Sequence, residues 1–211
     1  MKRLLFAGLP LVLLAAAACG DNQGEAKADG PNPVVVMETS KGTIKIELFA
    51  DKAPVTVKNF LSYVDEKFYD GTTFHRVMPD FMIQGGGFLP GLTQAKGEDD
   101  VKKLERKTHD PIKNEATNGL HNERGTIAMA RTGDPNSATA QFYINVEDNT
   151  NKLDPNPRRD PNGYCVFGKV IDGMDVVDQI KDVRTTEILG GAMADIPMKD
   201  VLIKSVRRAD K

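Results

Sequence analysis

Three polar side chains that could contact a ligand stand among large apolar residues, on short segments with the character of β-strands. They are Arg76, Gln84 and Gln141. A guanidinium with apolar neighbours needs a partner, because its charge is costly to remove from water alone. Either a carboxylate elsewhere in the fold pairs with Arg76, or the arginine lies beside an apolar pocket and is free to bind a carbonyl group of a ligand. The residues around Arg76 leave both alternatives open.

The segment that carries Arg76 is predicted to form two strands joined by a turn. Residues 72–77 alternate between two faces, a Pro-Asp dipeptide after them is typical of a tight turn, and residues 81–84 resume a strand before three glycines. This alternation places His75 on the opposite face of the strand from Arg76. We therefore expect His75 to be a structural, hydrogen-bonded histidine.

Two later apolar strand segments also carry positions that could contact a ligand, either through a polar side chain or through an accessible backbone. Residues 125–130 end in Met129-Ala130, where a ligand could approach the backbone, and residues 141–146 begin with Gln141. Together with Gln84, these positions suggest a groove lined by Phe, Met and Tyr that holds a few fixed hydrogen-bonding groups. Such a groove is the general form of a small-ligand or peptide site.

The remaining segments predict a mainly β protein. Residues 34–38 and 43–48 should form a hairpin, and a helix should begin at Pro54 with one apolar face. A second, short helix is expected over residues 174–180, and a last strand over 201–206. Many short strands, two helices and no βαβ alternation favour a barrel or sandwich with two helices packed on it.

Residues 87–111 form the least patterned part of the chain, and residues 91–111 within it form a charged loop. They are densely charged and broken by glycine and proline, which predicts a solvated loop with room for one helical turn. His109 within this loop is expected to be exposed. The loop either borders the groove or is a tolerated insertion.

The composition excludes several classes of function. The 28 basic and 30 acidic residues are balanced, which argues against nucleic-acid binding. The chain has no phosphate-binding loop of the GxxxxGK[ST] type and no zinc-finger spacing. A metal protein that uses His75, His109 and His121 is a weak alternative, because their spacing matches no ligand pattern. We expect neither a metal nor a cofactor.

The N-terminus is predicted to be an export signal. A basic start at Lys2-Arg3, a short apolar run over 4–14 and four alanines are typical of a signal peptide over residues 1–18. Cys19 follows directly, and this arrangement resembles a bacterial lipoprotein signal, in which the cysteine is lipidated. The alternative is an ordinary signal peptide cut beside an incidental cysteine.

Residues 19–33 are predicted to be a flexible tether, and residues 34–211 the folded domain. Cys165 is then the only other cysteine. Its apolar, strand-like neighbours predict a small buried hydrophobe rather than a disulfide partner of Cys19 or a catalytic thiol.

Four segments of the chain resemble the cyclophilin-type peptidyl-prolyl cis-trans isomerases, especially their exported bacterial branch. These segments are Phe74-His75-Arg76-Val77, Phe81-Met82-Ile83-Gln84-Gly85-Gly86, Met129-Ala130-Arg131 with Gln141-Phe142-Tyr143-Ile144, and Val166-Phe167-Gly168-Lys169-Val170. The resemblance runs from about residue 34 to 206. It implies a closed eight-stranded antiparallel β-barrel capped by two α-helices.

The resemblance also implies a role for each matching residue. Arg76 would be the catalytic arginine, supported by Gln84, and both Gln84 and Gln141 would reach the substrate backbone. The proline pocket would be lined by Phe81, Met82, Tyr143 and Leu153, with Tyr164 as a further wall where many relatives have His. Ala130 and Arg131 would offer backbone groups to the residues before the proline.

Two positions depart from the common pattern of the family. Tyr143 replaces the commoner Phe and brings a hydroxyl that would either find water or a loop carbonyl, or slightly change which residue is preferred before proline. Lys152 stands where many relatives have an aromatic residue, which puts tight binding of ciclosporin in doubt.

The resemblance implies an isomerase that rotates X–Pro bonds in exported or unfolded proteins. The rival is a binding module that captures proline-containing segments, or a chaperone that shields unfolded chains, without useful turnover. We expect a monomer on the periplasmic side of a bacterial envelope, joined to the membrane through its lipid alone. The outer membrane is the expected destination in a Gram-negative cell.

Overall fold

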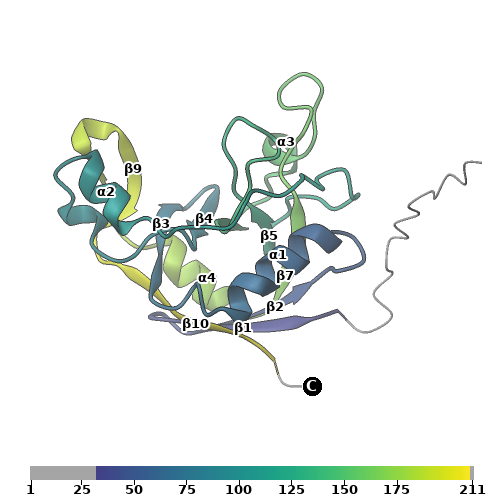
Figure 1. Ribbon diagram of the computed structural model, residues 1–211, viewed down its shortest axis with the longest axis horizontal. Coiled ribbons are helices and arrows are strands. Elements are labelled where there is room, and N and C mark those ends of the chain that lie inside the picture. The colour runs from purple at the N-terminus through teal and green to yellow at the C-terminus, as the bar shows by residue number, and fades with distance from the viewer. Residues whose placement is uncertain (1–31, 210–211) are drawn as a thin grey trace, which may run out of the picture.

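A computed structural model describes residues 32–209, and within them eight strands close into an antiparallel barrel (Figure 1). Their order around the barrel is β1-β10-β3-β4-β6-β5-β7-β2. The strands are β1 (Val34–Thr39), β2 (Thr43–Leu48), β3 (Thr72–Met78), β4 (Met82–Gly85), β5 (Thr126–Met129), β6 (Phe142–Asn145), β7 (Val166–Asp172) and β10 (Val201–Arg208). The prediction of a closed eight-stranded antiparallel barrel is confirmed.

The predicted hairpin of β1 and β2 shows how alternation builds the barrel wall. Met37 pairs with Ile44, and Val35 pairs with Ile46. All four side chains are fully buried, whereas the residues between them are partly or fully exposed. One face of each strand therefore fills the barrel interior, as the period of two requires.

Two helices bury their apolar faces in the same core. Helix α1 (Pro54–Asp65) begins at the predicted proline, and Val57, Phe60, Leu61 and Val64 are buried. Helix α4 (Met174–Lys181) buries Val176, Val177 and Ile180. Both sets belong to the cluster that fills the barrel, so the two helices were correctly predicted as core elements.

A second group of elements packs beside the barrel and was not fully predicted. Helix α2 (Glu98–Leu104) lies in the charged segment, and β8 (Thr185–Ile188) and β9 (Met193–Pro197) form a separate two-stranded sheet. We call residues 88–105 together with 185–197 the side lobe. Figure 1 shows α2 and β9 together at the left of the view, and the short helix α3 (Thr150–Leu153) near the top.

A β-bulge interrupts β3 at His75. Phe74 pairs with Gly85 and Arg76 pairs with Gln84, so His75 is the extra residue. Phe74 and Val77 are both fully buried in the barrel core. Both residues between them, His75 and Arg76, are therefore displaced from the core face. The prediction that strict alternation separates His75 from Arg76 was wrong, because a bulge inserts one residue and re-aims the side chains around it.

Candidate active site

Arg76 stands on the outer side of β3 with a partner at each end of its guanidinium. Its Nη2 donates to Met78 Sδ at 3.1 Å, and its Nε lies 3.7 Å from Oδ2 of Asp195 on β9. The arginine side chain is still 42% exposed. Both alternatives left open by the sequence are therefore realised at once: Arg76 has a carboxylate partner from a remote segment, and it remains open to a group from outside.

Gln84 and Gln141 form a hydrogen-bonded pair beside Arg76. Gln84 lies opposite Arg76 in the next strand, but its Nε2 donates to Gln141 Oε1 at 2.9 Å rather than supporting the arginine directly. The Gln141 side chain lies over Gly87, where an added Cβ would come within 2.5 Å of its Nε2. The last glycine of the triplet thus leaves room for this pair.

An apolar cluster separate from the barrel core lies next to these amides. Met82, Ala128, Tyr143, Leu153 and Val166 are its buried members. The partly buried residues packed against it are Met78, Phe81, Leu120, Ala130 and Tyr164. The five predicted pocket-lining residues are therefore brought together, from β4, β6, α3 and the segments that flank them.

The hydroxyl of Tyr143 is satisfied inside the protein. It donates to Asn122 Oδ1 at 2.8 Å, and burial raises the pKa of this phenol well above its usual value. Asn122 Oδ1 also accepts from Asn145 Nδ2, and Asn122 Nδ2 donates to Asp154 Oδ1. The expectation of a water or loop carbonyl as partner was wrong, because the side chain of the buried Asn122 accepts the hydrogen bond from the phenol.

The positions of Ala130 and Arg131 differ in their backbone and side-chain roles. The N–H of Ala130 donates to the Gln141 carbonyl at 3.0 Å and is thus used within the sheet. The Arg131 side chain is only 5% exposed and pairs with Asp160. Its Nε and Nη2 donate to the Gly163 carbonyl, and its guanidinium carbon lies 4.2 Å from the centroid of the Tyr164 ring. Arg131 therefore fastens the loop that carries Tyr164.

Beside the apolar cluster an open pocket of about 360 Å³ extends from the turn after β3 to Asp195. Lys152 stands at its edge, with Nζ 5.3 Å from the centroid of the Phe81 ring. The ammonium group of Lys152 thus lies over the ring of Phe81. The pocket is lined by Met78, Pro79, Asp80, Phe81, Lys152 and Asp195.

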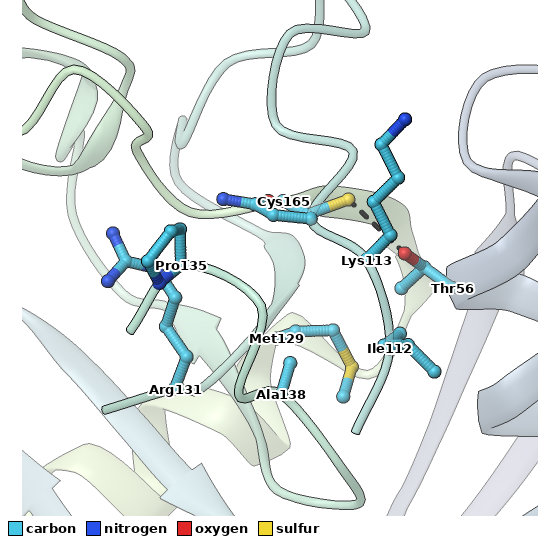
Figure 2. Close-up of a pocket in the computed structure, with 9 residues that line it drawn as sticks. Thr56, Ile112, Lys113, Met129, Arg131, Pro135, Ala138 and Cys165 are labelled. Atoms are coloured by element: carbon cyan, nitrogen blue, oxygen red, sulfur yellow. Dashed lines mark hydrogen bonds between the residues drawn. The ribbon is translucent and has the colours of Figure 1, made fainter. Parts of the chain in front are cut away.

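Cys165 lies apart from the groove, against a cavity with room for about one water molecule. Figure 2 shows its sulfur facing the hydroxyl of Thr56, at 3.5 Å. Burial raises the pKa of the Cys165 thiol to about 11. Because a thiol must ionise to act as a nucleophile, the structure supports the prediction of a small buried hydrophobe.

The three histidines occupy separate environments. His75 is buried against Phe88, and its Nδ1 has no hydrogen-bond partner among residues 32–209. His109 is exposed, as predicted, stacks on Tyr63 and contacts Glu66, and His121 contacts Asp154. Over the same residues no group of three His, Cys, Asp or Glu side chains could hold a metal ion, and no helix is long and apolar enough to span a membrane.

Sequence reasoning missed Met78, Asn122 and Asp195. Met78 could have been found, because it lies two residues beyond Arg76 and so shares its face of the strand. Asn122 and Asp195 had no local signal, since both come from irregular or short segments far along the chain. The assembled groove offers N–H donors beside an apolar surface, without an activated nucleophile.

The chain folds as a closed antiparallel β-barrel with an open pocket of about 360 Å³ beside an apolar cluster that is separate from the barrel core. The model of the family described as "Cyclophilin type peptidyl-prolyl cis-trans isomerase/CLD" matches residues 34–208. The chain belongs to this family of cyclophilins, and it is a peptidyl-prolyl cis-trans isomerase.

Individual relatives agree with this assignment. The chain is 53% identical to peptidyl-prolyl cis-trans isomerase B of Escherichia coli (strain K12) over 173 residues, which cover 82% of this chain and 98% of the relative. It is 45% identical to peptidyl-prolyl cis-trans isomerase A of Dickeya dadantii over 206 residues, or 98% and 97% of the two chains. The fold is similar to that of a Cryptosporidium parvum cyclophilin, with a TM-score of 0.64 at 24% identity, covering 85% and 99% of the chains.

Proposed function

We propose that this isomerase assists the folding of exported proteins, and that Arg76 is its catalytic residue. The observation that carries the catalytic assignment is a half-exposed guanidinium held at the edge of an apolar cluster. The hydrogen-bonded amides of Gln84 and Gln141 lie on the neighbouring strands.

The barrier that Arg76 would lower comes from amide resonance. Rotation about a peptide bond costs about 18–20 kcal/mol, and an uncatalysed X–Pro step takes tens to hundreds of seconds. As the bond twists, the prolyl nitrogen becomes pyramidal and gains a lone pair. A guanidinium N–H can donate to this lone pair, and because that interaction exists mainly in the transition state, it accelerates the rotation.

The other site residues would bind and orient the chain. The proline ring would pack on Phe81, Met82, Tyr143 and Leu153, with Tyr164 as an outer wall. The Gln84–Gln141 pair would donate to the substrate backbone, and the Ala130 and Arg131 main chain would contact the residues before the proline. Holding both sides of the bond lets one peptide plane rotate against the other.

The decisive experiment compares the wild type with Arg76→Ala on one X–Pro peptide, by NMR exchange spectroscopy and by titration. We expect Arg76→Ala to lose at least about tenfold in exchange rate, roughly 1.4 kcal/mol of barrier, while peptide binding changes less. Full exchange activity in a correctly folded Arg76→Ala variant would contradict the catalytic assignment. Binding without exchange in the wild type would favour a capture module.

The export part of the proposal rests on the leader. We infer a signal peptide over residues 1–18, a lipidated Cys19, a tether over 19–33 and an isomerase domain over 34–211. In support, the basic start, apolar run and four alanines precede Cys19 directly, and the alignment with the Dickeya relative covers 98% of this chain and so reaches into the leader.

The anchoring proposal places a monomer on the periplasmic side of the envelope, at the outer membrane of a Gram-negative cell. Its clients would be unfolded exported chains that contain proline. The test is incorporation of labelled palmitate in the host cell. The wild type should incorporate it and Cys19→Ala should not, whereas equal incorporation by both would exclude Cys19 as the attachment site.

A further inference from the structure

The side lobe has an apolar core of its own. Phe88, Leu92 and Ile196 are buried in it, and they belong neither to the barrel core nor to the apolar cluster of the groove. The partly buried residues packed around them are Val101, Leu104, Ile188 and Met193. The charged segment that contains α2 therefore does not line the groove cluster. It supports the β8–β9 hairpin instead.

Hydrogen bonds join this lobe to the strands of the site. The N–H of Thr73 on β3 donates to the Phe88 carbonyl in the lobe, and the N–H of Arg106, which directly follows the lobe, donates to the carbonyl of Gly87, just beyond β4. The N–H of Gly91 donates to Asp200 Oδ2, just before β10. The lobe is thus joined at two points to the wall that carries Arg76 and Gln84.

Strand β9 brings a carboxylate from the lobe to Arg76. Ile196 is 2% exposed and anchors the strand in the lobe core, while the preceding Asp195 meets the arginine. Asp195 has a φ of +62°, in the left-handed region that few residues other than glycine adopt. Aspartate tolerates this conformation better than most residues.

The contact engages only part of the guanidinium. Asp195 Oδ2 faces Nε, and Met78 Sδ accepts from Nη2, while Nη1 makes no hydrogen bond to any residue in the range 32–209. Because the guanidinium is planar, a partner on Nε restricts the orientation of the whole group. Nη1 is then left as the donor for a group in the groove.

The exposure of this ion pair argues against a role in stability alone. The side chains of Arg76 and Asp195 are 42% and 35% exposed. Pairs of this kind contribute little to folding, because water screens them and two long side chains must be ordered. Ordering is itself useful at a catalytic arginine, since a donor that is already oriented loses less entropy when the twisted bond forms.

We propose that Asp195 is a positioning residue for Arg76, held in place by the side lobe. It restricts the guanidinium through Nε so that the free nitrogen can donate to the rotating prolyl amide. This role rests on the proposed catalytic function of Arg76.

The first test replaces the carboxylate by its amide and follows kcat and KM separately. Asp195→Asn should lower kcat three- to tenfold, with KM changed less than twofold and an unchanged thermal midpoint. The matched control is Asp172→Asn on β7, where the same substitution removes the acidic partner of Lys45 on β2. This control should leave kcat and KM unchanged. The NMR signal of the Arg76 Nε–H should broaden in Asp195→Asn alone.

The second test asks whether Asp195 acts through Arg76. In an Arg76→Ala background, Asp195→Asn should cause no further loss. An equal loss in both backgrounds overturns the proposal, as does an unchanged or higher kcat in Asp195→Asn alone. If Arg76→Ala loses its activity but Asp195→Asn keeps it, only the positioning role fails. If Arg76→Ala keeps full activity, both the catalytic and the positioning roles fail.

Discussion

Tyr143 Oη donates to Asn122 Oδ1 at 2.8 Å, which joins the wall of the groove to a buried amide network. Asn122 Oδ1 also accepts from Asn145 Nδ2, and Asn122 Nδ2 donates to Asp154, which follows Leu153 in the chain. The departure from phenylalanine at position 143 is therefore accommodated inside the protein. The ring of Tyr143 belongs to the apolar cluster of the groove, and its hydroxyl is hydrogen-bonded within the buried network.

Replacing Tyr143 by phenylalanine should affect stability more than catalysis. Asn122 Oδ1 keeps a donor in Asn145, so only one hydrogen bond is lost, and the free energy of unfolding should fall by about 1 kcal/mol. Isomerase activity should stay within about threefold, because the apolar wall is retained. Urea unfolding and a peptide assay measure both quantities. A large fall in activity at unchanged stability would show that the hydroxyl acts in the groove.

Replacing Arg131 by lysine should loosen the loop that carries Tyr164. A lysine cannot reproduce the planar contacts to Gly163, Asp160 and the Tyr164 ring, and we expect a loss of about 1–3 kcal/mol in stability. The KM for an X–Pro peptide should rise several-fold, with a smaller change in kcat. Arg158→Lys, on the exposed part of the same loop, is the control and should change neither. Wild-type constants in Arg131→Lys would contradict the fastening role.

Replacing Gly87 by alanine should separate Gln141 from Gln84. The added Cβ would lie 2.5–2.7 Å from three atoms of the Gln141 side chain, which must move. We expect kcat/KM to fall about five- to twentyfold, within the range of a lost positioned hydrogen bond.

Gly133→Ala is the matched control for this change, because nothing lies within 4 Å of its added Cβ. A second control combines Gly87→Ala with Gln141→Ala. If the loss in kcat/KM comes from the clash with Gln141, Gly87→Ala should cause no further loss in the Gln141→Ala background. An equal loss in that background would point to a different cause.

The burial of His75 predicts lower stability in weak acid. Burial, together with the charge of Arg76, lowers its pKa from 6.5 to about 4. Below pH 6.5 the unfolded chain takes up a proton at His75 that the folded protein excludes, so the His75 contribution to stability falls between pH 6.5 and 4 and is constant above pH 6.5. The loss should be about 2 kcal/mol from roughly pH 7.5 to 5. Urea unfolding of His75→Gln should show a flatter profile, and an unchanged slope would contradict this cause.

His121 should act in the opposite sense. Its hydrogen bond to Asp154 raises its pKa above 6.5. Its contribution to stability is therefore fully present below pH 6.5 and lost as the pH rises through the higher folded-state pKa. Unfolding of His121→Gln at a series of pH values should lack this alkaline decline. A decline that persists in the variant would assign it to another group.

The repeating parts of the fold were predictable from local sequence. Ile44 and Ile46 alternate with polar residues in β2, and Val57, Phe60 and Leu61 recur on one face of α1. Such periods follow from the geometry of strands and helices themselves, so they can be recognised without knowing the partners. The β8–β9 hairpin escaped prediction because its strands are short and partly exposed, and its burial depends on the side lobe.

The sequence alone determined the barrel class and the motif that assigns the family, and it predicted the residues of the groove. Only the tertiary structure decided how those residues are held. The bulge at His75 turns the Arg76 side chain outward, and Asp195, on strand β9 near the C-terminus, contacts Arg76. Periodicity depends on neighbours along the chain, whereas a side chain's partners depend on which remote segments pack together, and a single sequence carries no local sign of that choice.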